Sequence, residues 1–291
     1  MSFRLIDSGT CGAAFNMALD EALARSVKEG LTPPAIRFYG WDRPSLSLGR
    51  FQKKEHFSHN KAGLDLQFIK ESGIPVVVRP TGGRAVLHGN ELTYSLVSCY
   101  EGAFEGKDLF GCYAVISQAM ERALRRFGVP VEVKMNRASV VSGMAQGFLA
   151  GGYKEKRERD DPGDNHLAGG KRPGRTLPCF GSVSYAEMTA NGRKIVGSAQ
   201  RRWTEGFLQQ GSIPFEIDGH LGEKVFRGCF DPRMMAGLAT LVPGANLALF
   251  KRFLAEEFEE VLGVPLAPSE PAPQELALAG ELLPGYESAC F

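Results

Sequence analysis

The sequence of 291 residues predicts an α+β protein in which mixed β-sheets are flanked by helices, with a small helical extension at the C-terminus. Three observations support this prediction. Two long segments repeat apolar residues at three- and four-residue steps, which is typical of amphipathic helices. Short β-branched or alternating runs lie between them and are typical of strands. Residues after Gly219 have a mostly helical pattern, so we expect a main domain over 1–218 and an extension over 219–291 packed on it.

The first half of the chain combines one helix with several short strands. Residues 14–28 are predicted as a helix because Phe15, Leu19 and Leu23 recur on one side. The run Val76–Val78 is β-branched throughout and is suited to a buried strand. The strands predicted in this half cover residues 35–39, 46–48, 75–79 and 92–98.

A second helix is predicted over residues 111–127. Gly128 and then Pro130 follow it, which is the usual order of residues at the end of a helix. A short strand over 131–134 comes next. Further along, an Asn191–Gly192 pair is typical of a two-residue hairpin turn. It predicts a three-stranded meander over residues 183–189, 193–201 and 207–214.

The bulk composition excludes several classes of protein. Lys and Arg number 34 against 33 Asp and Glu, so the formal net charge is +1, and no overall imbalance points to nucleic acid or to an anionic membrane. The N-terminus has no basic stretch followed by an apolar run, and no apolar stretch is long enough to span a bilayer. The six cysteines include no CxxC pair, which argues against a disulfide framework and a zinc site. We therefore expect a soluble protein of the cytoplasm.

The segment from Arg79 to His88 follows a predicted strand and contains two adjacent glycines, Gly82 and Gly83. Glycines at such a place let backbone amides approach a ligand, and the neighbouring arginines Arg79 and Arg84 suit a phosphate or a carboxylate. A glycine hairpin with solvated arginines is an equally good interpretation. The segment is not a P-loop, because no GK[ST] follows it.

The segment from Gly192 to Arg201 carries a lysine inside a predicted strand. Strand alternation predicts Lys194 and Val196 on one face and Ile195 on the other. A lysine there could point into a pocket, where its ammonium would lower the pKa of a thiol or polarise a carbonyl. The alternative is an exposed lysine beside a hairpin turn.

One cysteine stands out by its position. Residues 143–175 are rich in glycine and charge, so we expect a long mobile loop, serving as a lid, as a docking surface or only as a solvated insertion. Cys179 lies where ordered structure is predicted to resume after it, which favours an accessible thiol. A packed, inert cysteine is the alternative.

Three segments, in this order, resemble the biotin/lipoate protein ligase superfamily and, more narrowly, the LipM-type octanoyltransferases of lipoyl synthesis. The resemblance runs from the first helix to Pro214, and it implies a lipoate/biotin ligase-like catalytic domain over 1–218. The segments that carry it are Arg79–His88 with Glu91–Ser95, then Pro178–Phe180, and Gly192–Arg201 with Leu208–Ile213.

The resemblance implies a thioester relay. Cys179 would attack an octanoyl thioester on acyl carrier protein, and a lysine of a lipoyl domain, typically that of the glycine cleavage H protein, would then take the acyl group as an amide. Lys194 matches the family lysine that lowers the pKa of the thiol, and backbone amides near Cys179 would hold the oxyanion. No cofactor or metal is implied. The residues that match the walls of the acyl pocket are Arg79, Gly82, Gly83, Arg84, His88, Gly197, Ser198 and Ala199.

Other activities remain open at this point. An ATP-dependent lipoate ligase would use the same pocket for an acyl-adenylate, but the Arg-Asn-Asp element of those ligases corresponds here to 135–139, which contains no Asp. An amidotransferase that moves octanoyl between lipoyl domains would also use a cysteine. A carrier-binding scaffold would lack Cys179 or Lys194, and this sequence has both.

Overall fold

The computed structural model describes residues 2–52, 63–135, 186–227 and 229–287. They contain a large sheet of eight strands, in the order β11-β1-β2-β6-β10-β9-β8-β7, and a small sheet of three, in the order β4-β3-β5. The large sheet is formed by β1 (Phe3–Cys11), β2 (Ala35–Trp41), β6 (Glu91–Cys99), β7 (Val131–Met135), β8 (Ala186–Ala190), β9 (Arg193–Arg202), β10 (Gly206–Pro214) and β11 (Leu266–Pro268). The small sheet is formed by β3 (Ser45–Leu48), β4 (Val76–Val78) and β5 (Val86–His88).

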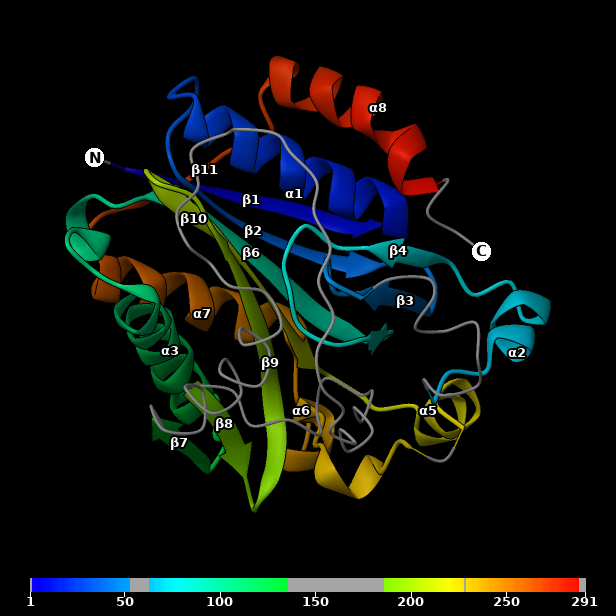
Figure 1. The fold of residues 1–291 in the computed structure, drawn as a ribbon. Helices are drawn as coiled ribbons and strands as arrows, with labels where there is room; N and C mark the ends of the chain where they lie inside the picture. Colours follow the sequence, from blue (N-terminus) through cyan, green and yellow to red (C-terminus); the bar gives the residue numbers. More distant parts are fainter. Residues whose placement is uncertain (1, 53–62, 136–185, 228, 288–291) are drawn as a thin grey trace, which may run out of the picture.

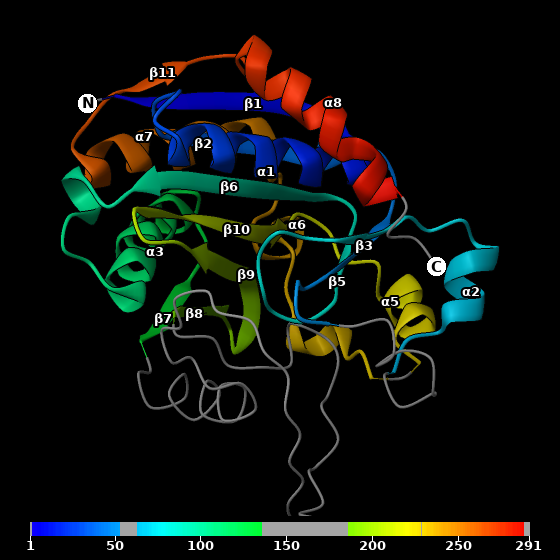
Figure 2. The same cartoon turned by 45° about the horizontal axis from the view of Figure 1, so that its top comes forward.

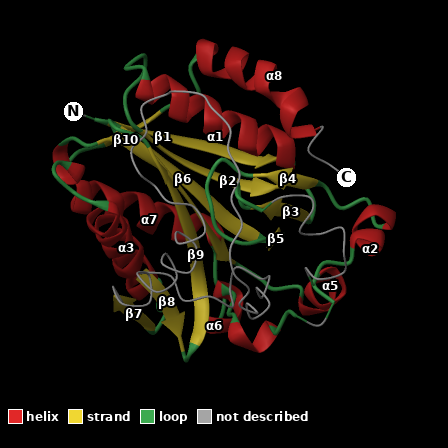
Figure 3. Ribbon diagram, in the orientation of Figure 1, coloured by secondary structure: helices red, strands yellow, loops and turns green. Residues whose placement is uncertain are grey.

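Helices cover both faces of the large sheet (Figures 1 and 3). On one face, α1 packs against the strands and α8 packs on α1; on the other, α3 and α7 pack side by side. Figure 2 shows α5 and α2 apart from these layers, beside the small sheet. The helices are α1 (Ala13–Lys28), α2 (Leu66–Glu71), α3 (Leu109–Arg126), α5 (Gly219–Val225), α6 (Leu238–Leu241), α7 (Leu247–Leu262) and α8 (Pro273–Glu287).

Because side chains alternate along a strand, the two faces of the large sheet contribute to two separate apolar clusters. In β6, Leu92, Tyr94 and Leu96 belong to the largest apolar cluster, under α3 and α7, whereas Val97 belongs to the cluster under α1. Thr93 and Ser95 share the α1 face with Val97 and are buried polar residues. The α1 face is therefore apolar at one end and polar at the other.

The predicted α+β fold with flanking helices is confirmed. The helices expected over 14–28 and 111–127 are α1 and α3, and the three strands of the predicted meander are adjacent in the sheet as β8, β9 and β10. Asn191 and Gly192 have φ angles of 51° and 72°, as a two-residue turn of mirror-image geometry requires. The loop expected over 143–175 lies outside the described residues.

The chain after Gly219 is mostly helical, but it also supplies a strand. β11 pairs in parallel with β1, and the buried side of α7 belongs to the same apolar cluster as α3 and β6. An ion pair between half-buried Arg4 and buried Glu275 (2.8 Å) joins the first strand to α8. The division into 1–218 and 219–291 stays a prediction, and the two ranges share one core. None of the described helices combines the length and the apolar character needed to span a membrane.

Candidate active site

A cavity lies at the polar end of the α1 face, with about 380 Å³ between its walls when the open solvent at its mouth is counted. Strands from both sheets and helix α1 form its walls, so the fold brings the arginine–glycine loop and strand β9 together around one space. The residues that line it are Met17, Tyr39, Trp41, Ser47, Arg79, Val86, His88, Thr93, Gly197, Ser198, Ala199, Gln210, Gly211 and Ser212.

Arg79 lines this cavity, but its guanidinium is bonded to the protein. Nε and Nη2 donate to the Gly82 carbonyl (3.0 and 2.6 Å), and Nη2 also donates to the Arg84 carbonyl (2.7 Å). Nη1 donates to the carbonyl and hydroxyl oxygens of Ser47 (3.2 and 3.1 Å). The alternative of a solvated arginine is therefore wrong for Arg79, which is 6% exposed and holds the loop in shape.

Gly83 is needed for close packing in the loop, whereas Gly82 has room for a Cβ, and neither glycine lines the cavity. Gly83 has a φ of 91°, and a Cβ atom there would lie 2.6 Å from Arg79 Nη2 and 3.6 Å from the Cβ of Ala199. Gly82 lies against the ring of Phe51. Any side chain at position 83 would strain the backbone and displace the Arg79 guanidinium that holds the loop. Arg84 is half-buried and contributes its carbonyl to Arg79 rather than its side chain to the cavity.

His88 is fixed in the cavity wall by three contacts. Its ring stacks on Trp41 with centroids 3.9 Å apart, Nδ1 contacts Glu91 Oε1 at 2.8 Å, and Nε2 contacts Ser47 Oγ at 2.7 Å. Burial alone would raise the pKa of Glu91, but His88 and the hydroxyl of Thr93 outweigh it and hold that pKa below its ordinary value. His88 thus faces the cavity with its ring, while both ring nitrogens are used by protein partners.

Strand β9 carries a β-bulge where it meets β8. Met188 pairs with Val196, yet the next residue, Thr189, pairs with Lys194, so Ile195 is an extra residue in β9. Ile195 and Val196 both belong to the main apolar core. The alternation expected from the sequence, with Ile195 opposite Val196, is therefore wrong, because a bulge shifts the register of side chains by one.

The bulge changes the face on which Lys194 lies. The pairs Gly197–Ser212 and Ala199–Gln210 place Gly197 and Ala199 on the cavity face of the sheet. Because Ile195 is an extra residue in the strand, Lys194 lies on that same face. Its side chain is 4% exposed, so the alternative of an exposed hairpin lysine is also wrong. Its carbonyl accepts a hydrogen bond from the backbone of Ala236 (3.0 Å), which fixes this stretch of β9 from outside the sheet.

The remaining predicted pocket residues, Gly197, Ser198 and Ala199, follow one another in β9 and all line the cavity. The Ser198 hydroxyl bonds to the phenol of Tyr94 (3.0 Å), which is buried so deeply that its pKa rises to about 12 despite this bond. Gly211 lies opposite Ser198, and a Cβ there would come within 2.2 Å of the Tyr94 ring. Tyr94 belongs to the apolar cluster under α3 and α7, so these contacts lie on the side of the sheet away from α1 and fix the strands that form the cavity floor. Cys179 lies outside the described residues.

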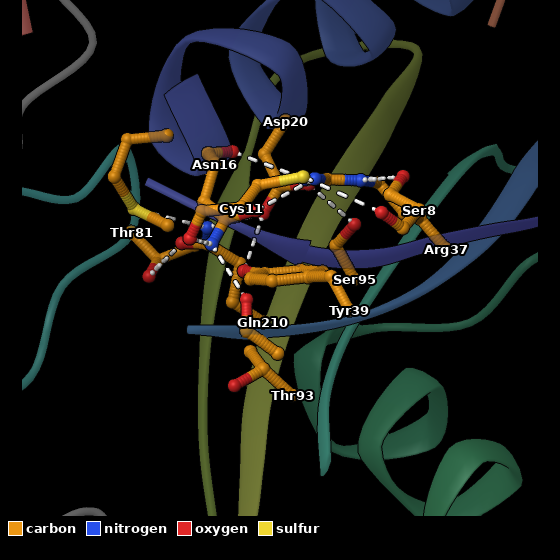
Figure 4. Close-up of polar contacts among 12 residues, drawn as sticks. Ser8, Cys11, Asn16, Asp20, Arg37, Tyr39, Thr81, Thr93, Ser95 and Gln210 are labelled. Atoms are coloured by element: carbon orange, nitrogen blue, oxygen red, sulfur yellow. Dashed lines mark hydrogen bonds and ion pairs between the residues drawn. The ribbon is translucent and has the colours of Figure 1, made fainter. Parts of the chain in front are cut away.

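A polar network that was not predicted from the sequence lies beneath the cavity (Figure 4). Asp20 and Arg37 are fully buried and form an ion pair at 2.9 Å. Asp20 also accepts hydrogen bonds from Ser95 (2.7 Å), Tyr39 (2.8 Å) and Gln210 (2.7 Å). Four donors surround one carboxylate, as a buried charge requires. The sequence contained one indication of this network, because Asp20 interrupts the apolar run of α1 and Arg37 interrupts that of β2.

Comparisons with known proteins agree with this geometry. Residues 12–259 match the lipoyl protein ligase A/B catalytic domain family. Octanoyltransferase LipM of Geobacillus kaustophilus is 38% identical over 225 residues, which are 77% of this chain and 69% of that protein. Octanoyltransferase LipM of Bacillus subtilis is 33% identical over 291 residues, covering 94% of this chain and 91% of that protein.

Solved structures show the same fold at low sequence identity. A bi-partite lipoate protein ligase from Thermoplasma acidophilum superposes with a TM-score of 0.70 at 20% identity, covering 99% of this chain and 94% of that one. Lipoate-protein ligase A bound with ATP superposes with a TM-score of 0.68 at 21% identity, covering 99% and 96%. The chain therefore belongs to the lipoyl protein ligase A/B catalytic domain family, as an octanoyltransferase of the LipM type.

Proposed function

We propose that this protein moves an octanoyl group from acyl carrier protein to a lysine of a lipoyl domain, through a thioester on Cys179. The glycine cleavage H protein is the proposed acceptor, and the cytoplasm is the proposed location. The observation that carries the proposal is the cavity itself. Its described lining contains no Asp, Glu or Lys, and the guanidinium of its one arginine is bonded to protein oxygens. Such a lining suits an uncharged acyl chain.

The relay consists of two balanced acyl transfers. In the first, the Cys179 sulfur bonds to the octanoyl carbonyl carbon, the bond to the pantetheine sulfur breaks, and the thiol proton of Cys179 ends on that leaving sulfur. In the second, the lysine nitrogen bonds to the same carbon, the bond to Cys179 breaks, and a proton from the nitrogen ends on the Cys179 sulfur. Exchange between thioesters is nearly balanced and amide formation is downhill, so neither step needs ATP.

We assign the activation of Cys179 to Lys194. A buried ammonium close to a thiol stabilises the thiolate, which is the reactive form of cysteine. The burial of Lys194 and its place on the cavity face of β9 support this role. Gly197, Ser198 and Ala199, three to five residues further along the same strand, would then lie against the acyl chain.

The proposal is tested with octanoyl-acyl carrier protein in the absence of ATP. Intact mass spectrometry should show one octanoyl adduct that hydroxylamine removes. The Cys179→Ala variant should form none, whereas Cys229→Ala, which changes an exposed cysteine, should form the adduct as the wild type does. A wild type without adduct, or an adduct that survives in Cys179→Ala, would contradict the relay. ATP-dependent modification of an acceptor by Cys179→Ala would establish a ligase instead.

A further inference from the structure

A second and larger cavity adjoins the acyl cavity. It holds about 1350 Å³ of unfilled space, including its open mouth, and it lies between β5, the end of β10 and helix α5. Val86, His88 and Ser212 line both cavities, so the two spaces are separated by the thickness of these side chains. The proposed relay gives no role to this second space.

Three carboxylates line the second cavity, and its described lining includes no lysine or arginine. Glu216 and Asp218 are exposed at its mouth, and Glu91 is buried at the end that meets the acyl cavity. Glu216 Oε2 accepts a hydrogen bond from Asn90 (2.7 Å), and Asp218 Oδ1 accepts one from the backbone of Leu221 (2.9 Å) at the start of α5. These neutral donors position the two mouth carboxylates without neutralising their charge.

One buried hydroxyl in this wall makes no hydrogen bond of good geometry. Ser212 is 5% exposed, and its Oγ makes no hydrogen bond. It lies close enough to the Glu91 carboxylate to help lower the pKa of that group, but it reaches no acceptor at hydrogen-bond distance and angle. Most buried hydroxyl groups are satisfied, because leaving one without a partner costs free energy. An unsatisfied hydroxyl on the wall between two cavities points to a ligand that would satisfy it.

We propose that the second cavity receives the side chain of the acceptor lysine, a primary amine on a flexible apolar stem. This inference rests on the proposed function and adds the place from which the amine attacks. Glu216 and Asp218 attract the ammonium at the mouth. Further in, the Glu91 carboxylate is already bonded by His88 and Thr93, and the buried side chains of Phe226 and Met235 favour the neutral amine, which is the nucleophilic form. Ser212 Oγ then accepts a hydrogen bond from the amine.

The cavity also lies beside the proposed catalytic lysine. Met235 forms a parallel bridge with Lys194, and the next residue, Ala236, donates its backbone hydrogen bond to the Lys194 carbonyl. An amine that reaches Met235 therefore approaches the strand that carries Lys194. The ammonium releases one proton to water on entry. After the nitrogen bonds to the acyl carbon, its second proton ends on the sulfur of Cys179 as the thioester breaks.

The test separates the two half-reactions of the full-length protein. Octanoyl-enzyme is prepared first, and transfer to a lipoyl-domain protein with an unmodified lysine is then followed by mass spectrometry. Glu216→Gln/Asp218→Asn should raise the acceptor KM about tenfold at low ionic strength, and salt should shrink the difference. Both replacements keep the hydrogen-bond acceptors, so the start of α5 is preserved. Ser212→Ala should lower the rate of transfer at saturating acceptor.

Matched controls make the result specific. Glu105→Gln/Glu223→Gln removes two exposed carboxylates outside both cavities and should leave the acceptor KM unchanged. Hydroxylamine, a neutral nucleophile, should cleave the octanoyl-enzyme of the Glu216/Asp218 variant as fast as that of the wild type. An unchanged KM in that variant, or an equal change in the control, overturns the lysine site and leaves the relay standing. A wild type that forms no octanoyl-enzyme overturns the relay, and the lysine site with it.

Discussion

The hydroxyl of Thr81 donates a hydrogen bond to Gln210 Oε1 at 2.8 Å and thereby ties the arginine–glycine loop to strand β10. The amide nitrogen of the same Gln210 donates to Asp20 (2.7 Å), so one side chain connects the loop to the buried Asp20–Arg37 pair. Thr81 is fully buried and Gln210 is 5% exposed. The position of the loop is therefore set by polar contacts in the core as well as by the packing of its glycines.

Replacing Gln210 with leucine should test this connection. The variant leaves the Thr81 hydroxyl without an acceptor and removes one of the hydrogen bonds to the Asp20 carboxylate. This loss should lower the free energy of unfolding by about 1–3 kcal/mol. Acyl-enzyme formation should also slow, because the loop forms part of the cavity wall. Urea unfolding and the rate of adduct formation measure the two effects. Gln67→Leu, which changes an exposed residue of α2, should leave both unchanged.

Lys194→Met should slow acyl-enzyme formation through the pKa of Cys179. Removing a nearby ammonium destabilises the thiolate, so the pKa of the thiol should rise. The rate of alkylation of Cys179 by iodoacetamide, measured against pH, should therefore shift to higher pH. Lys194→Arg keeps a charge and should shift the profile less. An unshifted profile in Lys194→Met would remove Lys194 from the mechanism.

The lowered pKa of Glu91 predicts part of the acid sensitivity of the fold. Its folded pKa lies below the ordinary value of 4.5, so ionised Glu91 contributes stability that is fully present above pH 4.5. That contribution is lost as the pH falls through the folded value. Glu91→Gln should therefore show a weaker loss of stability as the pH falls below 4.5 in denaturant titrations. Glu223→Gln, at an exposed position, should retain the slope of the wild type.

The sequence predicted the elements whose pattern is local. The apolar spacing of α1 and α3 and the Asn191–Gly192 turn need no distant partner to be recognised. The first strand, β1, was missed, because Arg4, Asp7 and Thr10 interrupt its apolar pattern. β1 forms as a strand because it pairs on both sides, with β2 and β11. Short β5 was hidden within the arginine–glycine segment.

Part of the cavity lining was predicted from the sequence, but its contacts were not. The resemblance to the family pointed to Arg79, His88, Lys194 and the stretch Gly197–Ala199. In the structure all of these except Lys194 line the cavity, and Lys194 lies on the same strand, β9, as Gly197–Ala199. The bulge at Ile195 was not predictable from alternation, because it depends on how β9 registers with β8. Arg79 holds the loop against Ser47, and Gln210 connects the loop to strand β10. Both contacts are hydrogen bonds between residues far apart in sequence, so the sequence pattern does not reveal them.

Gly211 is the position at which a single methyl group, added on the Tyr94 side of the sheet, should displace the strands that form the cavity floor. In Gly211→Ala the new Cβ would lie 2.2 Å from the Tyr94 ring and 2.8 Å from Ser198 Oγ, so the ring or the strands must move. Overpacking of this kind costs about 1–3 kcal/mol of unfolding free energy. It should also break the Tyr94–Ser198 hydrogen bond and slow octanoylation more than acetylation, because only the longer chain needs the full depth of the cavity.

The matched control for this substitution is Gly280→Ala. Gly280 lies within α8, and no atom lies within 4 Å of the place that a Cβ would take, so alanine there should stabilise the helix by about 0.5–1 kcal/mol. Thermal unfolding and the ratio of octanoyl to acetyl adduct, measured for both variants, separate a general glycine effect from one at the cavity. Equal acyl ratios in Gly211→Ala and in the wild type would show that the acyl chain does not reach Gly211, and would place its end nearer to Ala199 and His88.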